Sequence, residues 1–283
     1  MSKIKSYLSL IKSLQTILLL ITGIAGFIST RCPVMNFEIF AGLISSLFLT
    51  IGGTTVLNMV YDKDVDSKMK RTIKRPLPSG KISNSNAIIF GILMLITGLG
   101  ISFYMSILFG LIMFAGFFID FVIYTIWLKR KSAWSILWGG ISGGMPILAG
   151  RALGMGEIDM IGLLLSLSIL LWIPTHILTF NMLYFKDYKN AKIPTFPSKY
   201  GFNSTRIIIA LSSIGATIAI IIGTIALGLS WGYIRLILVL ASGSIILASI
   251  SIIKPSEKIN FGLFKYASIF MLSSMILIAL ATI

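Results

Sequence analysis

Nine long apolar segments constrain this chain more than any other feature of its sequence. Each has roughly the 20 residues that a helix needs to cross the hydrocarbon core of a bilayer. The segments lack the short alternating pattern of strands in a membrane barrel. We therefore predict an all-α, polytopic membrane bundle of nine transmembrane helices that forms a single domain over residues 1–283. The predicted helices cover residues 10–30, 37–60, 84–104, 106–127, 134–152, 158–185, 203–228, 231–253 and 262–282.

Charged residues are scarce, and their positions predict an orientation. They make up 12% of the chain, against roughly 25% in a soluble domain, which excludes a soluble enzyme. The net charge of +15 could suggest a nucleic-acid partner. However, 21 of the 24 Lys and Arg residues lie in the N-terminal segment and in alternate loops, and only Arg31, Arg151 and Arg235 lie on the other side. The positive-inside rule then places the N-terminus in the cytoplasm, and the lipid bilayer replaces nucleic acid as the partner.

Three polar side chains are spaced one helical turn apart at the end of the second predicted helix. Asn58, Asp62 and Asp66 recur at intervals of four, so they share one face, whereas Asp64 points elsewhere. One amide and two carboxylates form a hard oxygen site of the kind that holds Mg²⁺ together with phosphate oxygens. The alternative is a solvated helix end whose acids happen to align. Acids that continue into an apolar helix weigh against it, because such residues are costly and usually functional.

Basic residues surround these acids. A proline-stiffened loop with Arg71 and Arg75 follows directly, and a second cluster, Lys186-Asp187, closes the sixth predicted helix. Lys129 and Arg130 lie in another loop on the same side. Cations beside carboxylates suit a metal–phosphate site, although orientation alone could explain each lysine. Two cytoplasmic carboxylate clusters next to an apolar bundle predict a diphosphate head with a long hydrocarbon tail, in an active site that faces the cytoplasm.

Four further residues are candidates for the interior of such a site. Tyr124 and Tyr184 could form an aromatic wall that stabilises a carbocation, or they could be interfacial belt residues. His176 is the only histidine, and it is either a ligand of the acceptor or a packing residue. Asp120 is the one acid that lies well inside a predicted helix and not near its end, and a nearby cation is a candidate partner for it.

These motifs resemble those of one family. The Asn58, Asp62 and Asp66 run, followed by Arg75-Pro-Leu-Pro-Ser-Gly80, is similar to the first signature of the UbiA superfamily of intramembrane prenyltransferases. Over roughly residues 50–201 the chain most resembles the branch that farnesylates protoheme IX, the heme O synthases. The segments that carry this finer resemblance include Asp66-x-x-Met69-x-Arg71-Thr72, Tyr124-Thr125-x-x-Leu128-Lys129-Arg130, Gly139-Gly140-x-x-Gly143-x-Met145-Pro146 and Lys186-Asp187-Tyr188.

The resemblance implies nine transmembrane helices, a Mg²⁺ cofactor and transfer of a farnesyl group from farnesyl diphosphate to the vinyl group of heme B, which gives heme O. It also implies a role for each matching residue. The metal and diphosphate ligands would be Asn58, Asp62, Asp66 and Asp187, the neutralising cations Arg71, Arg75, Lys129, Arg130 and Lys186, and the acceptor or prenyl wall His176, Tyr124 and Tyr184.

Two other functions remain open from the sequence. Leu183-Tyr184 stands where an arginine is common in that branch, which leaves room for another acceptor, such as an aromatic quinone precursor or a prenylated glycerol phosphate. A transporter would also carry intramembrane acids, but it would place them near the middle of the bilayer. Here the largest group of acids clusters at one face, which the charge rule assigns to the cytoplasm. We expect the membrane to be the cytoplasmic membrane of a prokaryote.

Overall fold

The structure, a computed structural model, describes residues 3–31 and 37–282, and these residues form helices joined by turns. The all-α class predicted from the sequence is confirmed. The helices are α1 Lys3–Leu10, α2 Ser13–Ile28, α3 Phe37–Tyr61, α4 Lys63–Asp66, α5 Asn84–Met105, α6 Ile107–Phe117, the π-helix η1 Phe118–Leu128, α7 Ser135–Met155, α8 Met160–Leu183, α9 Phe185–Asn190, α10 Phe196–Ala226, α11 Trp231–Ile253 and α12 Glu257–Thr282.

Seven helices in the described ranges are long and apolar enough to cross a membrane, and α1 with α2 adds an eighth if this pair, bent by 55°, is one span. The predicted segment 134–152 is helical, as α7, but it is not among the seven. It is rich in glycine and carries Arg151, both of which lower its hydropathy. Nine crossings and a cytoplasmic N-terminus are therefore not confirmed by the structure and stay predictions.

Two predicted boundaries are wrong by more than a turn, and the first predicted helix, 10–30, is broken. α1 ends at Leu10 and α2 begins at Ser13, and α12 begins at Glu257 where residue 262 was expected. The seventh segment was expected to begin at residue 203, but α10 begins at Phe196. The backbone N–H of Thr195 donates to Ser198 Oγ at 2.9 Å, which starts the helix early. Gly201, at φ 83°, then adopts a non-helical conformation that a glycine reaches without strain, so the helix is kinked there.

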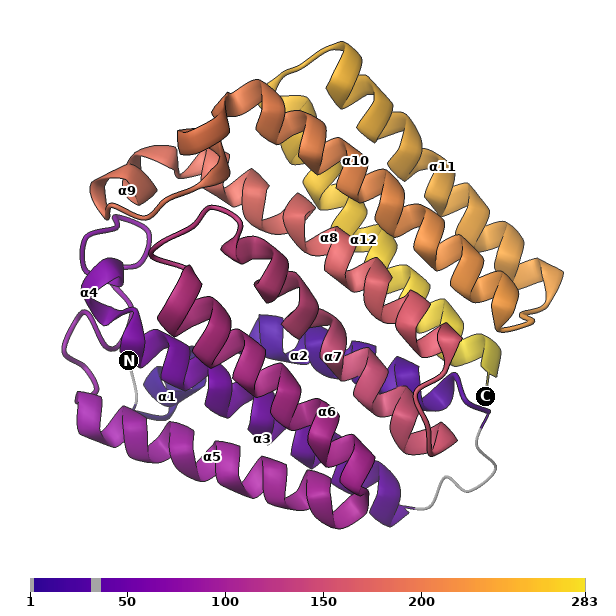
Figure 1. The fold of residues 1–283 in the computed structure, drawn as a ribbon, viewed down its shortest axis with the longest axis horizontal. Coiled ribbons are helices and arrows are strands. Elements are labelled where there is room, and N and C mark those ends of the chain that lie inside the picture. The colour runs from indigo at the N-terminus through magenta and orange to yellow at the C-terminus, as the bar shows by residue number, and fades with distance from the viewer. Residues whose placement is uncertain (1–2, 32–36, 283) are drawn as a thin grey trace.

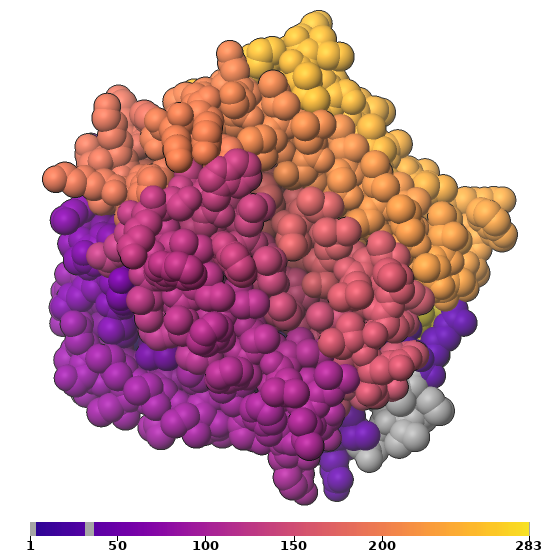
Figure 2. All heavy atoms as spheres, in the orientation of Figure 1, coloured from indigo at the N-terminus to yellow at the C-terminus, as the bar shows by residue number. Residues whose placement is uncertain are grey.

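The helices lie roughly side by side, and the short elements gather at one end of the bundle (Figure 1). α3 packs on α5, α7 lies between α2 and α8, and α8 packs on α10. The short helices α4 and α9 and the turn between η1 and α7 all lie at the end where α1 begins. Side chains fill the spaces between the ribbons on the face shown in Figure 2. This arrangement brings three polar segments that are distant in sequence to one end of an apolar bundle.

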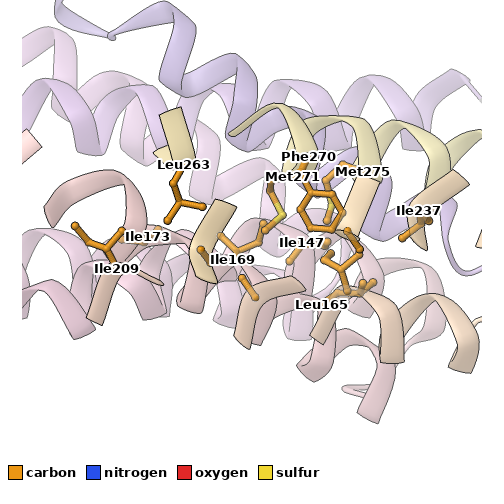
Figure 3. Packing of buried hydrophobic residues seen from close by; sticks show 14 of the residues in the cluster. Ile147, Leu165, Ile169, Ile173, Ile209, Ile237, Leu263, Phe270, Met271 and Met275 are labelled. Atoms are coloured by element: carbon orange, nitrogen blue, oxygen red, sulfur yellow. The ribbon is translucent and has the colours of Figure 1, made fainter. Parts of the chain in front are cut away.

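Aliphatic and aromatic side chains form the core between α7, α8, α10, α11 and α12. Ile147 of α7 contacts the cluster that includes Leu165 and Ile169 of α8 and Phe270 of α12 (Figure 3). In a membrane, such packing gains little from the hydrophobic effect, because lipid tails are equally apolar. Close van der Waals fit between the helices therefore has to provide the stability.

Small residues allow α2 and α7 to approach closely. A Cβ atom added at Gly150 would lie 1.9 Å from the carbonyl oxygen of Gly23, and one added at Gly26 would lie 2.1 Å from the carbonyl oxygen of Ile147. Both distances are far below contact distance, so backbone touches backbone here. Small residues at helix crossings are typical of membrane bundles.

At the end of the bundle opposite to α4, a buried arginine joins three segments. Arg151 of α7 pairs with Asp159, which caps α8, at 2.6 Å. Its guanidinium also donates to the carbonyl and hydroxyl oxygens of Ser29, after α2, at 3.0 and 2.8 Å. One of the three basic residues assigned to the far side is therefore a structural clamp.

We predict that Gly150→Ala destabilises the protein by about 1–3 kcal/mol, because the added methyl group forces α2 and α7 apart. The measurement is thermal unfolding of the purified protein in one detergent. Gly100→Ala in α5 is the matched control, since a Cβ atom there meets nothing within 4 Å. It should be neutral or stabilising by up to about 1 kcal/mol, owing to the higher helix propensity of alanine. Equal melting temperatures for the two variants would contradict the close crossing.

Candidate active site

The predicted stripe of Asn58, Asp62 and Asp66 is present although the helix breaks within it. α3 ends at Tyr61, and Asp62 has φ −84° and ψ 2°. The backbone N–H of Asp62 still donates to Asn58 O at 3.0 Å, and that of Asp66 to Asp62 O at 2.8 Å. The three side chains therefore stay one turn apart, from the end of α3 through α4.

The acids in this segment differ sharply in exposure. Asp62 and Asp66 are 8% and 4% exposed, whereas the side chain of Asp64 is 57% exposed. The prediction that Asp64 points elsewhere is confirmed. A buried carboxylate is stable only with a partner, and each of the two buried ones has a cation.

Each cation comes from a different segment. Lys129, directly after η1, donates through Nζ to Asp62 Oδ2. Arg75 of the proline-rich loop pairs through Nη1 with Asp66 Oδ2 at 2.7 Å. Burial by itself would lower the pKa of Lys129, but the neighbouring Asp62 carboxylate holds that pKa above its usual range. Lys129 is therefore a permanent cation beside the buried acids.

Arg130 faces away from these pairs. Its guanidinium donates to both carboxylate oxygens of Asp64 at 2.7 and 2.9 Å and to the carbonyl oxygen of Tyr61 at 2.8 Å. It also lies over the Tyr61 ring, 4.6 Å from the centroid. The hydrogen bond from Arg130 lowers the pKa of Asp64. This pair connects the end of α3 to the loop after η1. The Arg130 guanidinium forms its hydrogen bonds with Asp64 and Tyr61 and none with Asp62 or Asp66 among the described residues.

The π-helix aligns Tyr124 with Lys129. The N–H of Lys129 donates to Tyr124 O, five residues back, at 2.8 Å, and its Nζ lies 5.5 Å from the Tyr124 ring centroid. In a regular α-helix, residues five apart are rotated by about 140°, so the wider turn is what puts them together. π-turns often occur at functional sites. The sequence predicted an ordinary helix over 106–127, because its apolar pattern carries no signal for this insertion.

The second acidic loop meets the first. Asp187, in α9, is buried and accepts a hydrogen bond from the backbone N–H of Arg71 at 3.3 Å. Below this bond lies a small apolar cluster in which Val65 and Met69 pack against Ala191 and Ile193. The two carboxylate clusters predicted to face one cavity are thus adjacent. Lys186 is exposed, so its part in the site stays a prediction.

An aromatic ladder leads from this loop into the membrane-spanning part of α8. The guanidinium of Arg71 lies 5.1 Å from the Tyr184 ring centroid. Tyr184 stacks on Phe180 at 5.9 Å, Phe180 contacts His176 at 5.0 Å, and His176 contacts Trp172 at 5.3 Å. Phe180 and the continuity of the ladder were not predicted, although the spacing of four residues is visible in the sequence.

Two nitrogen atoms on this ladder lack a partner. Trp172 Nε1 and His176 Nδ1 are buried and make no hydrogen bond in the described part of the protein. Phe264 of α12 packs against His176 at 5.2 Å and against Phe180 at 5.3 Å. Buried polar atoms without a partner are costly, so these nitrogens mark a place where a ligand with polar atoms would be stabilised.

Asp120 has a structural partner that the sequence did not suggest. Its carboxylate accepts a hydrogen bond from Asn58 Nδ2 at 2.6 Å and a longer one from Ser142 Oγ at 3.4 Å. We expected a nearby cation, and Lys12 and Lys129 lie within electrostatic range of Asp120. Among the described residues, neither forms an ion pair with it within 4 Å. The bond fixes the amide of Asn58 so that its Oδ1 atom is free.

The donor set fits Mg²⁺ that arrives with a phosphate ligand. Asn58 Oδ1 and Asp62 Oδ1 are buried and accept no hydrogen bond from any residue that the structure describes. Among the residues that the structure describes, no three His, Cys, Asp or Glu side chains are grouped closely enough to hold a metal by themselves. Mg²⁺ is commonly held by one or two carboxylates, with phosphate and water oxygens completing its shell. Hard oxygen atoms beside cations match that mode of binding.

Comparison with known proteins gives one consistent result. The profile of the UbiA prenyltransferase family matches residues 19–274. The protoheme IX farnesyltransferase of Archaeoglobus fulgidus is 42% identical over 71% of this chain and 70% of its own length. The one from Pyrobaculum islandicum is 32% identical over 93% of this chain and 94% of its own length.

Solved structures show the same fold. A structure reported for a digeranylgeranylglyceryl phosphate synthase superimposes with a TM-score of 0.81 over 100% of this chain and 99% of that chain, at 23% identity. A UbiA homologue from Archaeoglobus fulgidus bound to GPP and Mg²⁺ gives a TM-score of 0.71 over 96% of this chain and 99% of that chain, at 17% identity.

We predict that Asp64→Asn lowers stability by less than about 1 kcal/mol at neutral pH, since the pair with Arg130 is largely exposed. The pKa of Asp64 is depressed, so the pair stabilises the protein above the ordinary Asp pKa and loses that effect as the pH falls through the lowered value. Melting temperatures of wild type and variant should therefore differ slightly at pH 7 and converge in acid. A difference that persists in acid would contradict the assignment.

Proposed function

Because this chain belongs to the UbiA prenyltransferase family, we propose that it transfers a farnesyl group from farnesyl diphosphate to a vinyl group of heme B, in a Mg²⁺-dependent reaction that gives heme O. The relatives at 30–42% identity named protoheme IX farnesyltransferase support this acceptor. The observation that carries the proposal is the pair of buried acid–cation contacts at the head of the aromatic ladder.

The polar end of the site suits the diphosphate. Mg²⁺ bound by Asp62, Asp66, Asp187 and Asn58 Oδ1 would neutralise the diphosphate and stabilise it as a leaving group. Lys129 and Arg75 already form ion pairs with Asp62 and Asp66. Each could therefore form a hydrogen bond to a phosphate oxygen without a large movement of its side chain. Lys186 lies next to Asp187 in sequence and would add charge at the rim. Arg130 is engaged by Asp64 and contributes to holding the loop.

Arg71 links the polar end to the apolar one. Its backbone holds Asp187, while its guanidinium lies on the Tyr184 ring. A guanidinium on an aromatic face keeps free donors for phosphate. Arg71 therefore suits the position where the diphosphate ends and the first prenyl carbon begins.

The chemical step then follows from charge. The bond between C1 of the farnesyl chain and the diphosphate oxygen breaks, and its electron pair leaves with the diphosphate, which the cations stabilise. The faces of Tyr124 and Tyr184 stabilise the positive charge that develops on the allylic carbons. The π electrons of the heme vinyl group form the new bond to C1. Water adds to the resulting cation next to the porphyrin and releases a proton, which completes the hydroxyethylfarnesyl group.

The acceptor fits the deeper part of the ladder. A porphyrin is flat and aromatic, so it can stack against rings such as Phe180 and Phe264. The unpaired His176 Nδ1 and Trp172 Nε1 would then orient it by polar contact. We place this site at the cytoplasmic face of a prokaryotic membrane, following the distribution of basic residues.

A different acceptor is the second candidate. The structure reported for a digeranylgeranylglyceryl phosphate synthase has the higher TM-score of the two solved structures described above. At 23% identity this likeness concerns the fold. A prenylated glycerol phosphate or an aromatic quinone precursor would bring its own anionic group into the membrane, and the ladder offers aromatic rings and two neutral nitrogens. Family membership favours an enzyme over the transporter that the sequence left open.

The direct test is prenyl transfer by the purified protein in detergent, with Mg²⁺, farnesyl diphosphate and heme B, followed by mass spectrometry of the heme. We expect a product with the mass of heme O that disappears with EDTA and returns when Mg²⁺ is added in excess. Mg²⁺-dependent release of farnesol without a heme product would refute heme as the acceptor. Unreacted diphosphate with folded protein would refute the proposed chemistry.

We predict that Asp62→Ala lowers the turnover number more than about 100-fold, because the leaving diphosphate loses metal-mediated stabilisation. Asp64→Ala is the matched control from the same turn and should keep most of the activity, since Asp64 is exposed and bound to Arg130. Both variants are to be compared at equal amounts of monodisperse protein. Similar activity of the two variants would exclude Asp62 from the reaction.

We predict that His176→Ala weakens heme binding by roughly 10-fold, the effect of one lost polar contact, and leaves the KM for farnesyl diphosphate within about twofold of wild type. Heme titration by absorbance and steady-state kinetics give the two values. Thr175→Ser, on the adjacent buried turn of α8, is a control for disturbance of the helix. An equal loss for both substrates would remove His176 from the acceptor site.

A further inference from the structure

Asp120 receives its main hydrogen bond from the amide of Asn58, a predicted metal ligand. Its carboxylate belongs to the first turn of η1 and contacts side chains of α3 and α7. Asn58 Nδ2 donates to Asp120 Oδ2 at 2.6 Å, and Ser142 Oγ lies 3.4 Å from Asp120 Oδ1. Ser142 Oγ also donates to the carbonyl oxygen of Gly139 at 2.9 Å, so its contact with Asp120 is the weaker one. The carboxylate therefore acts mainly on Asn58.

The π-helix brings Asp120 to this position. Asp120 accepts its hydrogen bond from Asn58. Nine residues later, Lys129 donates to Asp62, one turn further along α3. In a regular α-helix, residues nine apart point in opposite directions, about 180° from each other. The wider turns of η1 remove this difference, so both side chains reach the same face of α3.

This hydrogen bond decides which end of the Asn58 amide remains available. An ionised carboxylate can only accept hydrogen bonds, so Asn58 has to turn its Nδ2 atom towards Asp120. Its Oδ1 atom then lies on the other side of the amide, where it is buried and accepts no hydrogen bond within the described ranges. A contact that served only to join α3 and η1 would leave no such atom, because buried polar atoms are normally satisfied. The unpaired oxygen indicates a ligand beside it.

We propose that Asp120 is a positioning residue, which holds the Asn58 amide so that Oδ1 binds Mg²⁺ when the prenyl diphosphate is present. This inference rests on the proposed function, which assigns Asn58 to the metal. Asp120 would touch neither the metal nor the diphosphate. A hydrogen-bonded partner behind a metal ligand fixes the orientation of that ligand and strengthens metal binding. Without Asp120, the amide would be free to rotate and present Nδ2, a donor that repels a cation.

The test is calorimetric titration of the full chain, in detergent, with Mg²⁺ and inorganic pyrophosphate, which measures binding without turnover. Asp120→Ala should weaken binding by about 10- to 100-fold, the usual effect of removing such a partner. Asp120→Asn keeps an oxygen that accepts from Asn58, so the loss should be no more than about threefold. Ser142→Ala is the matched control. It removes only the longer contact and should bind within about twofold of wild type.

Two results would overturn the inference. One is binding by Asp120→Ala within about twofold of wild type, and the other is an equal loss in Asp120→Ala and Asp120→Asn, since the second variant keeps the acceptor. If Asp120→Ala does not fold, Asp120→Ser takes its place. Its hydroxyl group ends one atom short of the carboxylate oxygens, and the same loss of affinity is expected.

A double-mutant cycle separates a role through Asn58 from a general effect on the bundle. Asn58→Ala should weaken binding of Mg²⁺ with pyrophosphate, and Asp120→Ala added to it should change the affinity by less than about twofold, because no amide is left to orient. A further loss as large as that of Asp120→Ala alone would overturn the inference.

Kinetics provide a second readout. In Asp120→Ala the Mg²⁺ concentration for half-maximal turnover should rise by about 10-fold or more, while the KM for heme B stays close to that of wild type. An equal rise of both values would contradict the role at Asn58. If wild type binds Mg²⁺ with pyrophosphate and Asp120→Ala binds it equally well, only the role of Asp120 fails. If wild type neither binds it nor consumes farnesyl diphosphate, the proposed function fails first.

Discussion

Burial of carboxylates at one end of an apolar bundle is the constraint on which the rest of the site depends. Removing a charge from water costs several kcal/mol unless a well-placed partner compensates. Asp62 and Asp66 obtain their partners from η1 and from the proline-rich loop, through Lys129 and Arg75. These two ion pairs therefore dictate where three segments meet, and the α2–α7 crossing and the aliphatic core keep the helices in register beneath them.

Under the proposed function, the same pairs would prepare this end of the bundle for an anion. In each pair the cation already lies beside the buried acids, so little reorganisation would be needed when a diphosphate binds. Asp187 joins them through the backbone of Arg71, and the ladder from Tyr184 towards Trp172 continues into the apolar region. The polar head and the apolar tail of the proposed substrate would thus bind to separate, adjoining surfaces.

Much of the helix pattern could be predicted, and the exceptions have physical causes. Long apolar runs indicate helices directly, so α3, α5 and α11 lie close to their expected ranges. The predicted start of α10 was wrong, because the polar segment before residue 203 has the composition of a loop. The hydrogen bond between Thr195 and Ser198, which begins the helix, is a local contact that this composition does not indicate. α7 is helical where expected. Its glycines lower its mean hydropathy, so it is not among the helices that are apolar enough to count as membrane spans.

The sequence by itself determined the class of fold, the alignment of Asn58, Asp62 and Asp66 and the abundance of cations near them, because hydropathy and four-residue periodicity are local properties. Only the tertiary structure decided which cation meets which acid. It assigned Arg130 to Asp64, Asn58 to Asp120 and Asp187 to the backbone of Arg71. These choices depend on contacts between residues as much as 116 positions apart and on backbone conformations, such as the π-turn, that hydropathy does not encode.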